Sequence, residues 1–418
     1  MSEVLEQTAE SWPEVVVSDV SELIRGVTYS KEHATDKPQN GYTPVLRATN
    51  IQESRLVLES DLVFVPDGNV SAIQRLRAGD IVVATSSGSK HLVGKSGLVH
   101  ADWRGSFGAF CAAIRPKANI EPRFLAAFLQ SPSYWKQVGK KALGVNINNL
   151  RRGDIESLTL PLPPLEKQRE IVAELEKQFS RLDEAVANLQ RVKAKLKRYK
   201  ASVLKAAVEG RLVETVGGWR QAKLGEIALS VRNGYSHKPD AESGTRIFRI
   251  SAVRPMELAA DDVRYLSGSS ADYDTFLTIA GDVLFTRYNG SRDYVGVCAV
   301  VPAGLPSTAY PDKLIRVRVP HDQLLPAFLV IAASKGAGRE FIESMIRTTA
   351  GQSGVSGTDI KAIPLSIPSL DEQKRIVAEV DRHLSIVREV EAEVDTNLQR
   401  AQTLRQATLA KAFGHESV

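Results

Sequence analysis

Cysteine and long apolar runs are scarce in this chain of 418 residues. Its two cysteines, Cys111 and Cys298, are too few for a disulfide framework or a zinc site of their own. No apolar run approaches the roughly 20 residues that a membrane-spanning helix needs. The polar, acidic start "MSEVLEQTAE" is also unlike a signal peptide. We therefore expect a cytoplasmic protein with both thiols buried in strand-like core segments.

A complete phosphate-binding loop is missing as well, although "SSGSKHLVGKSG" ends in the Gly-Lys-Ser of such a loop. The motif requires a glycine five residues before Gly94, because only glycine lets the backbone curl around phosphate. Serine stands there, and the nearest glycine is Gly88. The segment "GLVHADW" that follows is typical of a strand and a turn, whereas a P-loop needs a helix whose amino end faces the phosphates. These residues therefore do not predict a nucleotide site.

The composition is that of a globular protein with two or three domains, with 43% hydrophobic and 25% charged residues. The formal net charge is +5 and the isoelectric point is near 9.0. This balance permits nucleic-acid binding without establishing it.

The chain repeats itself at long range. "PLPPLEKQREIVAEL" returns as "LSIPSLDEQKRIVAEV", so that Ile171 reappears as Ile376, 205 residues later. Upstream, "AGDI" returns as "AGDV" and the Gly-Ser-Lys of the loop returns as Gly-Ser-Arg, both 202 residues later. The second loop, "RYNGSRDYVGVC", has Val297 in place of Lys95, which again argues against phosphate gripping. The similar offsets indicate one duplicated unit with a pseudo-twofold layout.

Two long helices are predicted, from about Glu166 to Glu209 and from about Asp371 to Phe413. Both segments are free of proline and glycine and carry apolar residues at heptad spacing, as a coiled coil does. The expected seam residues are Ile171, Leu175, Leu182, Leu189, Leu196 and Val203 in the first helix, and Ile376, Val380, Val387, Val394 and Leu404 in the second. Neither helix can bury its seam alone, so we expect the two to pack against each other in antiparallel fashion.

The remaining sequence predicts two globular halves, residues 12–160 and 219–363, with short β-branched strands and matched helices. They share a framework and differ in loops, where function resides when a scaffold is duplicated. Arg, Lys, Asn and Gln side chains in such loops can read base edges. The candidate DNA-binding residues of the first half are Arg47, Thr49, Asn50, Ser89, Lys90, His91, Lys95, Asn146 and Asn148. Those of the second half are Arg249, Ser251, Arg254, Arg287, Tyr288, Asn289, Ser291, Arg292 and Gln352.

Plainer interpretations exist for two of these features. The Gly-Ser-basic loops can be solvated hairpin turns. The basic end of the first helix, residues 191–205, can be a solvated face, although it also suits a DNA backbone or an acidic partner.

Together, the doubled "LPLPPLEKQREIV" and "LSIPSLDEQKRIV" helix starts, each after a globular half, resemble the specificity subunits of type I restriction-modification systems. The second copy departs slightly, with Ser369 for proline, and the end of the first helix, "SVLKAAVEGRL", is also similar to the family. The resemblance implies a mixed α+β fold in which two target-recognition domains (1–163 and 211–367) alternate with two antiparallel spacer helices (164–210 and 368–418).

The resemblance further implies a bipartite DNA target, with one half-site for each domain and a gap set by the helices. The partners would be duplex DNA, two modification methyltransferase subunits and a restriction subunit, with S-adenosylmethionine and ATP bound by those partners. The chain itself is expected to be non-catalytic, because it has no methyltransferase Pro-Pro motif and no convincing metal cluster among its seven histidines. A coiled-coil scaffold whose globular halves bind protein remains the alternative, and an independent enzyme is the third class.

Overall fold

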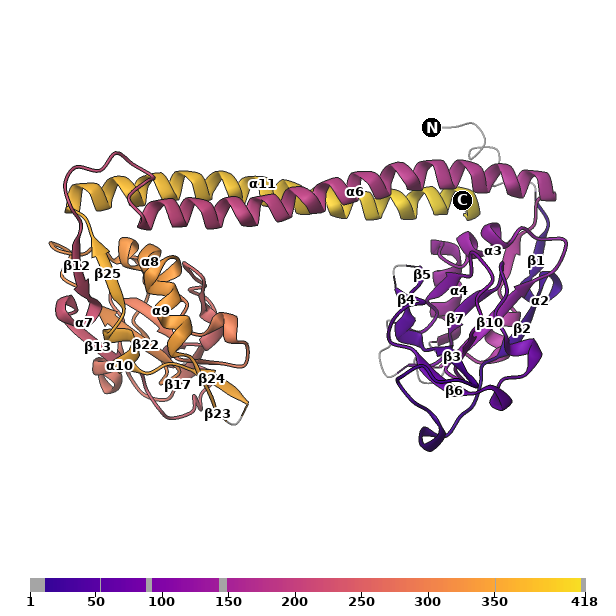
Figure 1. Ribbon diagram of the computed structural model, residues 1–418, viewed down its shortest axis with the longest axis horizontal. Coiled ribbons are helices and arrows are strands. Elements are labelled where there is room, and N and C mark those ends of the chain that lie inside the picture. Colours follow the sequence, from indigo (N-terminus) through magenta and orange to yellow (C-terminus); the bar gives the residue numbers. More distant parts are fainter. Residues whose placement is uncertain (1–11, 53, 88–91, 143–148, 350, 415–418) are drawn as a thin grey trace. The chain divides into compact units, whose positions relative to one another are not determined.

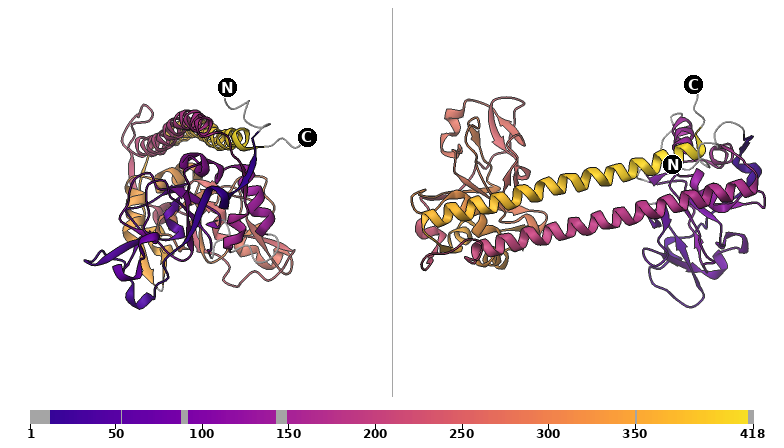
Figure 2. Two further views of the ribbon diagram at one scale, coloured as in Figure 1. Left: turned by 90° about the vertical axis from the view of Figure 1, so that its right-hand side faces the viewer. Right: turned by 90° about the horizontal axis from the view of Figure 1, so that it is seen from above.

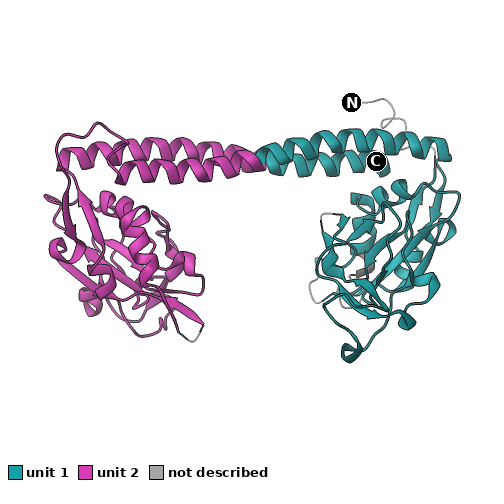
Figure 3. Cartoon of the chain, in the orientation of Figure 1, with its two compact units in different colours: residues 1–189, 396–418 teal, residues 190–395 magenta. Residues whose placement is uncertain are grey.

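The computed structural model describes residues 12–52, 54–87, 92–142, 149–349 and 351–414. The chain forms two compact units, coloured separately in Figure 3. Unit 1 comprises residues 1–189 and 396–418, and unit 2 comprises residues 190–395. This partition divides both long helices between the units. The assignment of the helices to domains of their own stays a prediction.

Unit 1 contains a β-rich domain built on two sheets (Figure 1). The first has the order β2-β10-β7-β8, with every neighbour antiparallel. Its strands are β2 (Ser21–Arg25), β10 (Cys111–Pro116), β7 (Ile81–Ala84) and β8 (Ser96–Leu98). In the second sheet, β3 (Tyr42–Leu46) pairs antiparallel with β6 (Val63–Pro66) and parallel with β9 (Ser106–Phe107). Two short ribbons, β1 (Glu14–Val16) with β11 (Thr159–Pro161) and β4 (Ile51–Gln52) with β5 (Arg55–Leu56), complete the domain.

Unit 2 repeats this topology. Its four-stranded sheet has the order β13-β22-β18-β20, and its three-stranded sheet has the order β17-β14-β21 with the same pattern of directions. The strands are β13 (Ser230–Asn233), β22 (Leu314–Arg318), β18 (Val283–Thr286), β20 (Cys298–Val300), β17 (Val263–Leu266), β14 (Thr245–Phe248) and β21 (Thr308–Ala309). The two ribbons are β12 (Arg220–Lys223) with β25 (Pro364–Ile367) and β15 (Val253–Arg254) with β16 (Glu257–Leu258). The repeated topology confirms the predicted duplication of an α+β domain.

One further sheet belongs to unit 2. Strand β24 (Gln352–Gly354) pairs with both β19 (Tyr288–Asn289) and β23 (Arg347–Thr349). In the part of unit 1 that the structure describes, the corresponding position carries a single bridge between Ser86 and Asn149.

Short helices pack on the sheets in both units. They are α2 (Val17–Val20), α3 (Pro122–Phe128), α4 (Pro132–Ala142) and α5 (Arg152–Glu156) in unit 1, and α7 (Leu224–Ile227), α8 (Pro326–Ser334), α9 (Ala337–Met345) and α10 (Gly357–Lys361) in unit 2. The inner strands β7 and β18 are buried at every position. Cys111 and Cys298 are buried core thiols, also as predicted.

The two long helices are α6 (Leu165–Val208) and α11 (Leu370–Phe413). Within unit 1, Arg405 of α11 donates to Asp183 of α6 over 2.8 Å. Within unit 2, Lys193 of α6 donates to Asp395 of α11 over 2.7 Å. The contact partner on α11 therefore moves backward along the sequence as α6 advances, which confirms the antiparallel pairing. In each unit the two helical segments lie side by side in both views of Figure 2.

Each domain anchors the start of one helix and the end of the other. In unit 1, Phe413 at the end of α11 packs its ring against Phe124 at 5.0 Å and Phe128 at 5.8 Å between ring centroids. In unit 2, Leu204 and Ala207 near the end of α6 join the core of the second domain. The ends of both long helices are thus held by contacts with a domain.

The predicted seam is right for most positions on α11 and wrong for one. Ile376, Val380, Val387 and Val394 are all less than 5% exposed, whereas Leu404 is 55% exposed. The heptad that includes Val394 continues through Ala401, which is 8% exposed. On α6, Ile171, Leu175 and Val203 are buried, and Leu182, Leu189 and Leu196 are half-buried. A second heptad series on α6, which runs from Ile171 through Val192 and Tyr199, is largely open, since Val192 and Tyr199 are 37% and 45% exposed.

No helix in the described part of the chain is long and apolar enough to cross a membrane.

Candidate nucleic-acid interface

The motif Ala-Gly-Asp places a buried carboxylate directly before strand β7 in the first domain and strand β18 in the second. Asp80 accepts hydrogen bonds from Arg115 at 2.7 and 2.8 Å, and Asp282 accepts from Arg318 at 2.6 and 3.2 Å. The hydrogen bond to Asp80 raises the pKa of the Arg115 guanidinium above its ordinary value. Both carboxylates also accept a backbone N–H three residues upstream. Each aspartate therefore links its turn to the neighbouring strand.

Equivalent backbone hydrogen bonds hold the loops that follow β7 and β18 in the two domains. We call this part of each domain its loop edge. Thr85 N donates to Phe110 O over 2.9 Å in the first domain, and Arg287 N donates to Lys313 O over 2.8 Å in the second. The carbonyl of Thr85 in turn accepts from Leu150 N, as that of Arg287 accepts from Val355 N. The loops after β7 and β18 therefore leave equivalent frameworks at equivalent points. The sequence that looked like a P-loop tail leads through Gly94, at φ +88°, into strand β8, so no helix follows it.

In the first domain, two predicted residues share one acidic partner. Asp61 accepts hydrogen bonds from the guanidinium of Arg47 and, over 2.6 Å, from the hydroxyl of Thr49. Arg47 and Asp61 are 44% and 50% exposed, so solvent screens their ion pair and the fork of Arg47 is accessible.

Asn50 is a correction to the sequence-based list. It is fully buried, and its side chain bonds the backbone of Arg47, Val57 and Ser60 at 2.8 to 3.0 Å. With all these groups already satisfied inside the domain, Asn50 shapes the loop and cannot contact a base.

The second domain repeats this arrangement of an arginine and a hydroxyl around an aspartate, which we call the arginine-aspartate clamp. Asp262 accepts from the hydroxyl of Ser251 and lies 3.5 Å from Arg249 Nε. An arginine, a hydroxyl two residues later and an aspartate 11 or 12 residues after the hydroxyl thus recur at matching positions in both domains.

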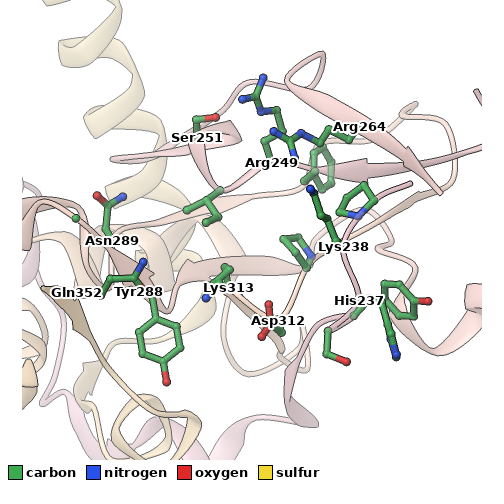
Figure 4. Close-up of a pocket in the computed structure, with 17 residues that line it drawn as sticks. His237, Lys238, Arg249, Ser251, Arg264, Tyr288, Asn289, Asp312, Lys313 and Gln352 are labelled. Carbon is green, nitrogen blue, oxygen red and sulfur yellow. The ribbon is translucent and has the colours of Figure 1, made fainter. Parts of the chain in front are cut away.

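A cavity of about 590 Å³ opens beside this clamp (Figure 4). It gathers five of the predicted residues, which come from different segments of the second domain: Arg249, Ser251, Tyr288, Asn289 and Gln352. The ring of Tyr288 lies 4.7 Å from the guanidinium carbon of Arg287 and 5.2 Å from Lys313 Nζ, both measured to the ring centroid. Gly354 makes room for the ring, since a Cβ there would lie 2.3 Å from Tyr288 Cδ1.

Sequence reasoning missed other residues that line this cavity. They are mostly charged or aromatic: Tyr235, His237, Lys238, Arg264, Asp312 and Lys313. Three of these residues lie in the segment "GYSHKP", whose composition suits a binding loop. No local sequence pattern predicts, however, that this segment lies beside β19 and β24. With Arg249, the cavity carries four cationic side chains among its lining residues, which favours a polyanionic ligand.

The other predicted residues of the second domain lie outside the cavity lining. Arg287 donates to the carbonyl of Asp312 over 3.3 Å, and Arg292 donates to the carbonyl of Glu343 over 3.1 Å. Arg254 and Ser291 are exposed. In the first domain Lys95 is half-buried beside Gly94. Ser89, Lys90, His91, Asn146 and Asn148 lie outside the described residues.

Among the described residues, no group of three or more His, Cys, Asp or Glu side chains could hold a metal ion.

Two copies of one β-rich domain, each followed by a long helix and each presenting different side chains on a common frame, define a duplicated recognition protein. The family model "Type I restriction modification DNA specificity domain" matches residues 9–198. The chain is 38% identical to the EcoKI specificity subunit of Escherichia coli K12 and 33% identical to the StySPI specificity subunit of Salmonella potsdam; each alignment spans 97% of this chain and 89% of the relative. The chain belongs to the type I restriction enzyme specificity subunits, which are non-catalytic.

Solved structures share the fold. A chain from a study of complex assembly and conformational transition of the type I R-M system superposes with a TM-score of 0.73 at 20% identity, over 98% of this chain and 99% of that one. The HsdS subunit from Thermoanaerobacter tengcongensis gives a TM-score of 0.52 at 20% identity, over 97% of each chain. These likenesses bear on architecture alone.

Proposed function

We propose that this chain reads a bipartite DNA target, with one half-site contacted by each β-rich domain. The observation that carries the proposal is the loop edge, where identical backbone hydrogen bonds hold different side chains in the two domains. A common frame with different side chains suits two different short sequences. The cation-lined cavity of the second domain supplies both charge for phosphates and carboxamides for base edges.

The repeated arginine-aspartate clamp suits contacts to the DNA backbone. Arg47 and Arg249 occupy equivalent positions, so they cannot by themselves distinguish one half-site from the other. The aspartate orients each guanidinium and leaves part of its fork free for a phosphate oxygen. The predicted contacts at Lys90, Arg292 and their neighbouring loop residues remain part of the proposal.

The partners follow from family membership. Two modification methyltransferase subunits and a restriction subunit would assemble with this chain, and those partners would bind S-adenosylmethionine and ATP. This chain would contribute sequence recognition and the surfaces that hold the complex together.

The helices would act as the ruler between half-sites. At about 1.5 Å per residue, the 44 residues of α6 span roughly 65 Å. Four residues inserted after Leu189, with a matching insertion after Val394, lengthen the pair by about 6 Å, close to two base pairs. We expect the half-sites to keep their sequences while the unspecified gap grows by one or two bases. An active insertion variant with the original gap would rule out the ruler.

Salt dependence separates this function from the scaffold alternative. Binding of the chain, in complex with its methyltransferase partner, to duplex DNA should weaken linearly in log affinity with log salt. Arg249→Ala and Arg264→Ala should each reduce that slope by about one. Lys374→Ala, which removes an exposed cation on α11 outside the cavity, should leave it unchanged. A flat salt response of the unaltered complex would favour a protein-binding scaffold.

A further inference from the structure

One turn occupies the same place in both domains, directly before an inner strand of each four-stranded sheet, β10 in the first domain and β22 in the second. In the first domain it spans Gly108 to Cys111, closed by a hydrogen bond of 2.8 Å from Cys111 N to Gly108 O. In the second it spans Pro311 to Leu314, closed by a bond of 2.9 Å between the matching atoms.

The turns are anchored identically at their middle residues. Ala109 N donates to Val27 O over 2.9 Å, and Asp312 N donates to Tyr235 O over 2.7 Å. The next residue, Phe110 or Lys313, accepts the backbone hydrogen bond from the loop after β7 or β18 described above. Three equivalent backbone hydrogen bonds in each domain thus place residue 109 with 312, and residue 110 with 313, in the same position of the common frame.

The side chains at these equivalent positions differ in every chemical respect. The first domain presents a methyl group and a phenyl ring, and the ring of Phe110 is 68% exposed. The second domain presents a carboxylate and an ammonium group, both at the wall of the cavity. A single exposed aromatic residue needs no explanation by itself. The difference between Ala109 and Phe110 in one domain and Asp312 and Lys313 at the equivalent positions of the other does need an explanation.

We propose that these two turns determine the sequence read by each domain. In the first half-site Phe110 packs against the methyl group of a thymine. In the second, Asp312 accepts from the exocyclic amine of a cytosine and Lys313 donates to the major-groove edge of its guanine partner. The inference rests on the proposed function and deepens it, because it names the residues that make the two half-sites different.

The chemistry of base edges supports this assignment. Phenylalanine discriminates among bases only through apolar contact, and the thymine methyl is the apolar group in the major groove. Asp61 and Asp262 are each paired with an arginine, whereas no ion pair among the described residues involves Asp312. An unpaired carboxylate repels phosphate, so this wall of the cavity suits bases better than the DNA backbone. Carboxylates accept from cytosine N4 and lysine donates to guanine O6 or N7, which are the two edges of one base pair. Lys313 is held for this contact by the face of Tyr288.

The test compares Phe110→Ala with Ile73→Ala in the complex with the methyltransferase partner. Ile73 is an apolar residue of the first domain that is 46% exposed and lies outside the turn, so it matches Phe110 in kind and controls for lost apolar surface. The methylated motif is mapped by sequencing of modified DNA, and binding is competed with duplexes altered at each base of the motif. Phe110→Ala should lower the preference for one thymine of the first half-site by about 5- to 150-fold. The second half-site, read by an untouched domain, reports that the complex still folds and assembles.

Lys313→Met provides the reciprocal test. It should relax one G·C pair of the second half-site and leave the first half-site intact. An unchanged motif in both variants would overturn the inference while leaving bipartite recognition standing. Loss of methylation in Phe110→Ala but not in Ile73→Ala would also overturn it, by marking Phe110 as an assembly contact. A wild-type complex that methylates no bipartite motif would instead refute the proposed function.

Discussion

The side-chain oxygen of Gln168 accepts a hydrogen bond of 2.8 Å from the backbone nitrogen of Glu121. Its amide nitrogen donates to the carbonyl of Pro163, also at 2.8 Å, and the side chain is fully buried. Gln373 makes the equivalent bonds to Leu325 and Pro368 in the second domain. The doubled helix-start motif therefore has a physical role, since its glutamine joins the first turn of each long helix to its domain.

Replacing either glutamine should be costly. Gln168→Ala removes the partner of the partly buried N–H of Glu121 and of the buried carbonyl of Pro163. Each orphaned group costs about 1 to 3 kcal/mol. Gln406→Ala, at an exposed position of α11, should change stability by less than about 0.5 kcal/mol. Chemical denaturation of the two variants gives the comparison. Equal stability of the Gln168→Ala and Gln406→Ala variants would show that the glutamine of the helix-start motif does not stabilise the fold.

The second prediction concerns Asn50. Asn50→Ala should destabilise the first domain by about 1 to 3 kcal/mol, because three backbone groups lose their buried partner. The folded fraction should still read the original half-site. The measurement pairs thermal unfolding with methylome mapping, and a changed base preference with normal stability would return Asn50 to the recognition surface.

A third prediction concerns the seam of α11. Val394→Ala removes buried methyl groups and should cost about 2 kcal/mol, whereas Leu404→Ala should stay within about 0.5 kcal/mol although it removes more carbon. Urea unfolding of both variants shows whether Val394 or Leu404 contributes more to the stability of the helix pair. A larger loss for Leu404→Ala would restore the sequence-based assignment.

The fourth prediction concerns the thiols. Burial raises the pKa of both Cys111 and Cys298 to about 12, whereas an unfolded thiol ionises near pH 8.5. Each thiol therefore contributes fully to stability below about pH 8.5, and that contribution is lost as the pH rises toward 12. Labelling with a thiol reagent at pH 8 should be slow until urea unfolds the protein. The exposed variant Ser385→Cys should react at once, and equally fast labelling of the native cysteines would contradict their burial.

The helices and the duplicated fold could be predicted because their signals are local or recur at similar offsets along the chain. Long segments without proline or glycine, with heptad spacing, locate α6 and α11 to within a residue or two. Leu404 was wrongly assigned to the seam because periodicity alone does not say whether Ala401 or Leu404 faces the partner helix α6. Ala401 is small and so looks insignificant in the sequence, yet it continues the heptad.

The site was harder to predict because residue type does not reveal burial or equivalence. Asn50 has the right chemistry for reading adenine, but its environment uses all of it. Phe110 and Lys313 escaped notice because they are 203 residues apart, whereas the neighbouring loops repeat at 202. Only the backbone hydrogen bonds show that the two positions correspond. Lys238, Arg264 and Asp312 reach one cavity from separate segments, which no spacing pattern indicates.

The most direct test of the account exchanges one whole domain. The first β-rich domain, residues 12–160, is replaced by that of a related specificity subunit, and the methylated motif of the complex is mapped by single-molecule sequencing. The account predicts that one half of the motif changes while the other half, read by residues 219–363, stays as it was. A chimera whose motif changes in both halves, or in neither, would contradict the assignment of one half-site to each domain.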